Sequence, residues 1–284
     1  MPPSSRCVPR RSSGKRTATE AIRTPGRVLD AANPALVAVA FSPYRDRQRE
    51  AYLRRLTYSE GLMKPIVVPT HGVQDWQQRL ADPDKHWRTG YSAKALAHAW
   101  EAAGGLPPEV AALLSPLGKA ELLLAVPEYD VPLPGGERPS QNDVFALVRT
   151  NDGLIVVTVE GKVSESFGPT LEEWRRDASA GKTERLAHIK AKLGLASDPP
   201  PGTRYQLLHR AASAVIEAER FHARDAAMIV HSFSPENASL GDYQAFLGLF
   251  GKKGGPGQMV ALGAPNGIRL WAGWAQGDAK FLRE

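Results

Sequence analysis

The sequence has almost no cysteine and no hydrophobic run long enough to cross a membrane. Cys7 is the only cysteine, which excludes a disulfide within the chain and a cysteine-based zinc site. The longest apolar run near the N-terminus, residues 35–41, is far shorter than the about 20 residues that span a bilayer. We therefore predict a protein without a membrane segment, in a reducing, cytoplasmic setting.

Excess positive charge is confined to the N-terminal part of the chain. Residues 1–62 contain 12 Lys/Arg and 5 Asp/Glu, whereas residues 63–284 contain 24 and 25. The net charge of +6 is therefore no argument that the folded part binds nucleic acid, although a local basic groove is compatible with it.

The same boundary separates two kinds of sequence. The first 27 residues are rich in Ser, Pro and Arg and have neither helical nor strand periodicity, which is typical of disorder. Met63 directly precedes KPIVVPT, which predicts a strand at 65–69. We interpret residues 1–62 as a disordered basic extension or a misassigned start, and residues 63–284 as one domain.

Helical and strand patterns alternate from residue 63 onward, which predicts one α/β domain with helices packed around a mixed sheet. The apolar run at 226–232 is typical of a central strand covered on both faces. A helix is predicted at 93–103, since Ser92 can cap its start and Gly104-Gly105 can end it. Other helices are predicted at 73–80, after Pro107-Pro108 to about Leu114, and at 170–178, 183–193, 205–220 and 240–250. Further strands are predicted from residue 121 and at 141–150, 154–162 and 268–275.

The stretch QNDVFALVRTNDGLIVVTVEGKVSE, residues 141–165, predicts a hairpin with charged ends. A loop of residues 151–152 sets Asp143 opposite Glu160, and a loop of residues 152–153 sets it opposite Lys162. Either loop keeps Asp143, Glu160 and Lys162 on one side of the sheet, because side chains alternate along a strand.

Two adjacent carboxylates repel each other, and burial makes their ionised forms costlier, so this arrangement is favourable only with a cation between them. Mg²⁺ or Mn²⁺ suits such oxygen ligands, and Lys162 would lie where an ammonium can neutralise developing charge or orient a water molecule. The alternative is an ordinary hairpin, in which Asp143 caps a strand and Glu160 pairs with Lys162 on a solvated face for less than about 1 kcal/mol.

Asp143, a spacer of 16 residues and Glu160-Gly161-Lys162 at a strand end resemble the signature of the PD-(D/E)XK, or restriction-endonuclease-like, nuclease superfamily. The superfamily core is a helix, three strands, a helix and a strand, an order that fits the predicted elements from about residue 92 to 232. Asn142 departs from the pattern, since it occupies the position of the superfamily's proline. The resemblance implies Asp143 and Glu160 as metal ligands and Lys162 as the catalytic lysine.

The resemblance also directs attention to residues outside the hairpin. Superfamily members often add a glutamate from the helix before the first strand; Glu101, Glu109 and Glu121 compete for this role, and we select Glu121 because it abuts the strand. On the helix at 205–220, Gln206, His209 and Arg210 lie opposite the apolar stripe. The implied fold brings them beside the metal site, where they would contact a phosphate or a base; a solvated helix face is the alternative.

We therefore expect a metal-dependent nuclease that hydrolyses phosphodiester bonds in nucleic acid, DNA more than RNA. A catalytically silent nuclease-fold module that binds nucleic acid or a protein partner is the alternative, and a homodimer is an open expectation. Residues 63–250 also resemble a group of uncharacterised bacterial single-domain proteins, a likeness that implies no activity.

Overall fold

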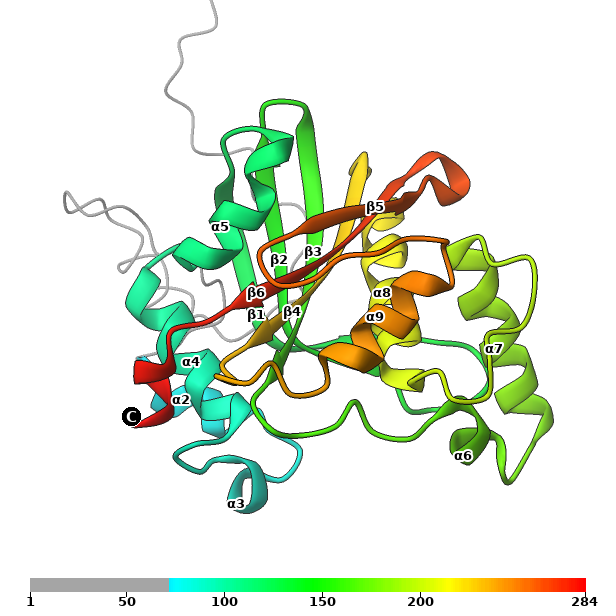
Figure 1. The fold of residues 1–284 in the computed structure, drawn as a ribbon, viewed down its shortest axis with the longest axis horizontal. Coiled ribbons are helices and arrows are strands. Elements are labelled where there is room, and N and C mark those ends of the chain that lie inside the picture. The colour runs from blue at the N-terminus through cyan, green and yellow to red at the C-terminus, as the bar shows by residue number, and fades with distance from the viewer. Residues whose placement is uncertain (1–71) are drawn as a thin grey trace, which may run out of the picture. The chain divides into compact units, whose positions relative to one another are not determined.

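A six-stranded mixed sheet lies at the centre of the computed structural model, which describes residues 72–284 (Figure 1). The strand order is β1-β2-β3-β4-β6-β5. The first three strands form an antiparallel meander, β4 and β6 run parallel to β3, and β5 is antiparallel to β6. The strands are β1 (Glu121–Val131), β2 (Ser140–Thr150), β3 (Gly153–Lys162), β4 (Asp225–Ser232), β5 (Met259–Gly263) and β6 (Arg269–Gln276).

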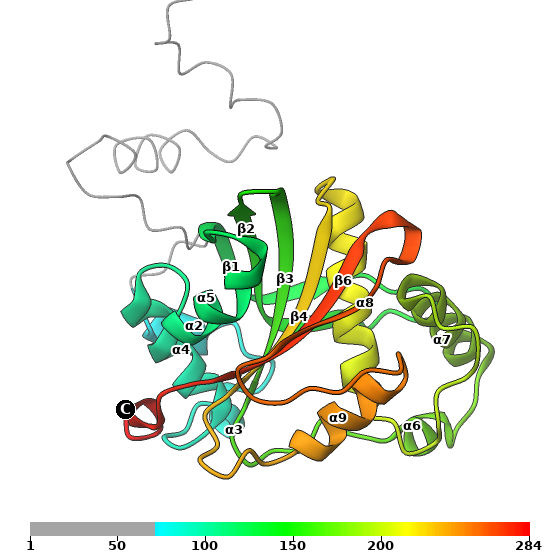
Figure 2. The same cartoon turned by 45° about the horizontal axis from the view of Figure 1, so that its top comes forward.

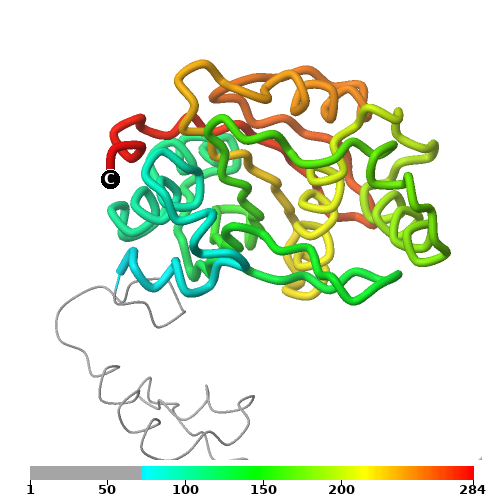
Figure 3. Tube along the Cα trace, turned by 90° about the horizontal axis from the view of Figure 1, so that it is seen from below, coloured from blue at the N-terminus to red at the C-terminus, as the bar shows by residue number. Residues whose placement is uncertain are grey.

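Helices cover both faces of this sheet, which confirms the predicted α/β architecture (Figures 1 and 2). One face packs against α4 (Ser92–Ala103) and α5 (Pro108–Leu114), and the other against α7 (Ala180–Leu193), α8 (Tyr205–Arg220) and α9 (Leu240–Gly248). Seen from below, the strands lie between these two layers, and the C-terminus lies on the α4 side (Figure 3). The short elements are α2 (Gln74–Gln77), α3 (Pro83–His86), α6 (Leu171–Arg175) and the 3₁₀ turns Ser115–Leu117, Pro265–Gly267 and Ala279–Leu282.

Alternation along the strands divides the buried apolar side chains into two clusters. On β2, Phe145 and Leu147 pack in the cluster beneath α8, whereas Val144 and Ala146 pack in the cluster beneath α4 and α5. Every residue of β4 is buried, as predicted for a central strand. The same alternation on β3 places Val156 in the cluster beneath α8 and Val157 in the cluster beneath α4 and α5.

Most of the predicted elements are present, with differences at their ends. Helix α4 begins at Ser92 itself, and its first amide donates to Glu165 Oε1 at 3.0 Å, so the predicted Ser92 cap is replaced by a glutamate from the loop after β3. Gly104 ends α4 in the left-handed conformation, with φ 58°. The helices predicted at 73–80 and 170–178 are shorter, and β5 was not predicted, since its five residues include no alternating pattern.

The described residues all belong to one unit, Leu62–Glu284. Within them, no helix combines the length and the apolar character that crossing a bilayer requires. The predictions of disorder in residues 1–62 and of a strand at 65–69 lie outside the described residues.

Candidate functional site

The turn between β2 and β3 fixes how the charged residues face each other. Thr150 pairs with Gly153, and the ladder continues to Val144 opposite Val159. The loop is therefore residues 151–152, and the next positions along the ladder are Asp143 and Glu160. This is the first of the two predicted registers, and it brings the two carboxylates to the same end of the sheet.

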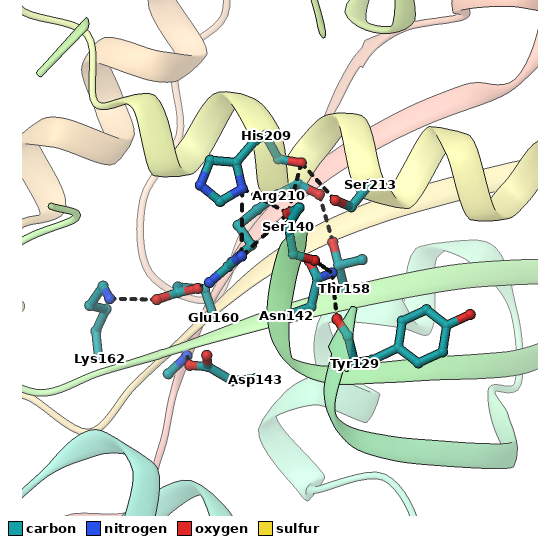
Figure 4. Close-up of polar contacts among 11 residues, drawn as sticks. Tyr129, Ser140, Asn142, Asp143, Thr158, Glu160, Lys162, His209, Arg210 and Ser213 are labelled. Carbon is teal, nitrogen blue, oxygen red and sulfur yellow. Dashed lines mark hydrogen bonds and ion pairs between the residues drawn. The ribbon is translucent and has the colours of Figure 1, made fainter. Parts of the chain in front are cut away.

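Glu160 is buried between two cations. Its side chain is 3% exposed, Lys162 Nζ lies 2.6 Å from Oε1, and Arg210 Nε lies 2.6 Å from Oε2. Figure 4 shows Arg210 reaching Glu160 from helix α8 and Lys162 reaching it along the strand. Although burial opposes its charge, Lys162 and then Arg210 hold the pKa of Glu160 below its ordinary value. Glu160 is thus an ionised carboxylate in the interior.

Lys162 is also buried, with 5% of its surface exposed. Its ammonium lies 5.0 Å from the centre of the Phe167 ring, in addition to its contact with Glu160. The alternative of a solvated Glu160–Lys162 surface pair is therefore wrong. A buried pair of this kind carries a desolvation cost that a surface pair does not, and it stays stable only while both charges remain matched.

Asp143, in contrast to Glu160, has no ion-pair partner among the described residues. Its Oδ2 accepts the Gly161 amide hydrogen at 2.7 Å. Burial, and then repulsion from Glu160, raise the pKa of Asp143 to about 7. The residue as a whole is only half-buried.

Gly161 is required by the close approach of Asp143. A Cβ at this position would lie 3.3 Å from Asp143 Oδ2 and 3.3 Å from Leu96 Cδ2 of helix α4. Any larger residue would push the carboxylate away from the amide that it accepts from. The glycine between Glu160 and Lys162 thus helps to position Asp143.

Asn142, at the position of the superfamily's proline, fastens the end of β2. It is fully buried, and its Nδ2 donates to the Tyr129 carbonyl at 3.1 Å and to the Ser140 carbonyl at 3.0 Å (Figure 4). A proline has no side-chain donor. The strand end that presents Asp143 is therefore held by side-chain hydrogen bonds to β1 and to β2 itself.

Glu128 is an acid of this region that the sequence analysis missed. In the β1–β2 ladder Pro127 pairs with Val144 and Tyr129 with Asn142, so Glu128 lies opposite Asp143. Its backbone is left-handed, with φ 51°, and its side chain is half-buried. Burial, and then repulsion from Asp143, raise the pKa of Glu128 to about 9. No local pattern marks it, because its partner strand is reached only through the loop at 132–139.

Helix α8 directs part of its polar stripe into the protein. Arg210, Ser213 and Glu217 are buried, so the alternative of a solvated helix face is wrong. Arg210 Nη1 donates to Ser140 Oγ at 3.3 Å, and Ser140 Oγ lies 2.7 Å from His209 Nδ1. Burial, and then Arg210, hold the pKa of His209 well below its ordinary value, so His209 is neutral at pH 7.

Glu121 does not belong to this site, which corrects the sequence prediction. It lies at the opposite end of β1, paired with Arg149, and its side chain is 54% exposed. Strands rise about 3.3 Å per residue, so the six residue steps along β2 from Arg149 to Asp143 separate Glu121 from the site by about 20 Å. The two other candidate glutamates have structural partners: Glu101 accepts from Trp76 Nε1, and Glu109 contacts His231 Nε2.

Replacing Glu121 by Ala is therefore expected to change the free energy of unfolding by less than about 1 kcal/mol, because the Glu121–Arg149 pair is a surface ion pair. Urea titration of the variant beside the wild-type protein measures this difference. In the same titration, Mg²⁺ should stabilise the two proteins equally. A smaller stabilisation of the variant would indicate that Glu121 contributes to metal binding.

The oxygens of Asp143 and Glu160 fit the needs of Mg²⁺. This ion usually binds proteins through one or two carboxylates and keeps several waters. Each carboxylate has about four lone-pair positions, of which Asp143 uses one and Glu160 two in the contacts described above. Within residues 72–284, no three His, Cys, Asp or Glu side chains are grouped so that they could hold a metal ion together. A metal site at this position would therefore have these two carboxylates as its protein ligands.

Comparison with known proteins yields one match. The sequence model of a family described as "Domain of unknown function (DUF6946)" matches residues 69–279. No curated protein and no solved structure matches the chain.

Proposed function

The chain belongs to the DUF6946 family, and from the geometry of its charged site we propose that it is a Mg²⁺-dependent nuclease with a PD-(D/E)XK-like active site. The observation that carries the proposal is the contrast between two neighbouring carboxylates. Glu160 is held ionised by Lys162 and Arg210, whereas Asp143 beside it has no ion-pair partner among the described residues and has a raised pKa. A divalent cation bound between the two carboxylates would favour the ionised form of Asp143.

The element order supports the same proposal. Helices α4 and α5, the meander β1–β2–β3, helix α8 and the parallel strand β4 follow one another as in the superfamily core. The charged residues lie where β3 ends and α8 begins its first turns, which is where the resemblance implies the active site. The proposed substrate is DNA, with RNA as a second substrate of the same chemistry, and the proposed setting is the cytoplasm.

The residues of the chain would divide the work as follows. Asp143 and Glu160 would hold Mg²⁺, which when bound stabilises charge on a phosphate oxygen and makes a bound water more acidic. Lys162 keeps Glu160 ionised, and its buried ammonium can donate to the attacking water or to the phosphate. Arg210 fixes Glu160 from the opposite side through a charge-assisted hydrogen bond.

A catalytically silent binding module is the second candidate. It is favoured by the fact that both oxygens of Glu160 already accept from protein cations, so the ion network is satisfied without a metal. Under this alternative the protein would retain nucleic acid in a salt-dependent manner without cleaving it.

Replacing Lys162 by Met is expected to abolish Mg²⁺-dependent cleavage, a loss of at least about 100-fold, because the ammonium that can act on the attacking water is removed. Plasmid, single-stranded DNA and single-stranded RNA, each with Mg²⁺, Mn²⁺ or chelator, provide the assay. The matched control is Lys280→Met, since Asp278-Ala279-Lys280 has the same acid-x-Lys spacing but lies on the surface with Lys280 63% exposed.

Cleavage that requires the metal, survives Lys280→Met and disappears with Lys162→Met would support the nuclease. Circular dichroism of both variants separates loss of activity from loss of folding. Binding without cleavage by the wild-type protein in any metal would favour the silent module instead.

A further inference from the structure

A shallow open depression lies beside the charged site, on the side of helix α8, and we propose that it receives an unpaired nucleobase of a single-stranded nucleic acid. Its volume is about 250 Å³, just below the roughly 300–1,000 Å³ of pockets for drug-sized ligands. It therefore suits a group of the size of one base. The proposal rests on the proposed nuclease function, because the nucleic acid is inferred from the neighbouring site.

The apolar part of the depression is lined by Phe167, Pro169 and Tyr205. The Tyr205 ring is stacked on Trp174 of helix α6, with centroids 4.0 Å apart and an interplanar angle of 12°. Phe167 is fully buried and Tyr205 is 8% exposed, so the exposed Pro169 presents most of the apolar surface there. A flat apolar surface of this kind suits a planar ligand such as a base.

The polar part of the depression is mostly uncharged. Gln206 lines it, and Gln206 Oε1 is buried without a hydrogen-bond partner among the described residues. His209 also lines it and is neutral at pH 7. Ser140 Oγ accepts from Arg210 and lies 2.7 Å from His209 Nδ1, and the neutral His209 ring has one donor and one acceptor nitrogen in either tautomer. The Gln206 amide and the His209 ring therefore bring hydrogen-bonding groups to the depression.

The charges argue for a base and against a phosphate in this position. Of the described residues that line the depression, Arg210 alone is charged, and its charge is matched by Glu160 at 2.6 Å. A phosphate placed here would meet only a guanidinium that is already paired, whereas the edge of a base can pair with the Gln206 amide, whose covered oxygen must turn outward to be reached.

The depression is connected to the charged site by shared residues. Arg210 lines it and pairs with Glu160, and Phe167 lines it and lies under the Lys162 ammonium. A nucleotide whose phosphate lies near Lys162 would therefore place a neighbouring base in the depression. In a duplex that base is stacked and paired, and extracting it costs a few kcal/mol. The inferred substrate is consequently single-stranded.

The test measures binding separately from cleavage. Fluorescence anisotropy of the full chain carrying Asp143→Asn, in chelator, compares a fluorescein-labelled single-stranded DNA, the same sequence in a hairpin duplex, and the equivalent single-stranded RNA. We expect the single strand to bind at least about tenfold more tightly than the duplex. Gln206→Trp, which fills the depression, and Gln206→Met, which removes its amide, should weaken single-strand binding about fivefold or more.

The exposed Gln78, directly after α2, provides the matched control, since Gln78→Trp adds the same ring far from α8 and should leave binding unchanged. Thermal melts confirm that each variant is folded. Equal binding of single strand and duplex, or no effect of both Gln206 variants, would overturn the inference. If those results came with metal-dependent cleavage by the wild-type protein, the nuclease proposal would stand and only the base site would be rejected. If the single strand bound as expected but no cleavage occurred, the nuclease proposal would be rejected and the base site would stand.

Discussion

Replacing Asp143 by Asn is expected to stabilise the metal-free protein by about 2–4 kcal/mol at pH 8, although the substitution removes a proposed metal ligand. Burial and repulsion from Glu160 raise the pKa of Asp143 to about 7 in the folded state, against 3.8 for an ordinary Asp. The folded protein therefore holds a proton that the unfolded chain releases. Asn keeps an oxygen to accept from the Gly161 amide and carries no charge.

The pH dependence of this gain follows from the same shift. Below about pH 4 Asp143 is protonated in both states and the two proteins should be equally stable. Between about pH 4 and pH 7 the unfolded wild-type chain loses its proton first, so the stability of the wild-type protein falls relative to the variant. Above about pH 7 both states are ionised, and the difference stays at its maximum.

Urea unfolding in chelator at several pH values measures this difference directly. Asp130→Asn, at an exposed position of β1, is the control and should change stability by less than about 0.5 kcal/mol at every pH. Mg²⁺ at about ten times its dissociation constant should then stabilise the wild-type protein by about 1.4 kcal/mol and the Asn variant much less. A variant that gains no stability at pH 8 would contradict the raised pKa of Asp143. An equal response of the two proteins to Mg²⁺ would contradict its role as a metal ligand.

The hairpin and its pair of acids could be predicted because the information is local. Turn residues limited the loop to 151–152 or 152–153, and with either loop alternation places Asp143 and Glu160 at one end of the sheet; the structure has the loop at 151–152. No distant contact is needed for either step. The order of the helices and strands followed in the same way from the periodicity of each segment.

The surroundings of these acids depend on contacts that periodicity does not encode. The polar stripe of α8 was recognised, but a polar stripe faces either solvent or buried charge, and only the packing of α8 against β3 decides this for Arg210. Glu128 is brought opposite Asp143 by a strand pairing across the loop at 132–139, which no periodicity within β1 encodes. Glu121 was chosen for its nearness to β1 in the sequence, yet an 11-residue strand separates its two ends widely.

Replacing Arg210 by Met is expected to cost about 1.5–3 kcal/mol of stability in chelator, because Glu160 loses a charge-assisted hydrogen bond but keeps Lys162 as its partner. Glu160→Gln should cost more, about 3–5 kcal/mol, since it leaves Lys162 and Arg210 buried without their anion. The control is Arg175→Met. Arg175 pairs with Asp198 at 3.5 Å on the surface, a contact worth at most about 1 kcal/mol.

The double variant distinguishes an ion pair from two independent packing losses. If Arg210 and Glu160 act as a pair, the loss in Arg210→Met/Glu160→Gln should be smaller than the sum of the single losses by about 1–3 kcal/mol. Strict additivity would mean that the two side chains contribute to stability separately. Urea unfolding of the four proteins supplies every value of this cycle.

Mg²⁺ adds a prediction in the opposite direction for Arg210→Met. Removing the guanidinium frees Glu160 Oε2 and removes a positive charge that repels an incoming cation. The ion should therefore bind this variant more tightly than the wild-type protein and restore part of the lost stability, whereas Glu160→Gln should respond weakly because it lacks a proposed ligand. Equal restoration of both variants would show that Mg²⁺ acts elsewhere, and it would remove Glu160 from the metal site.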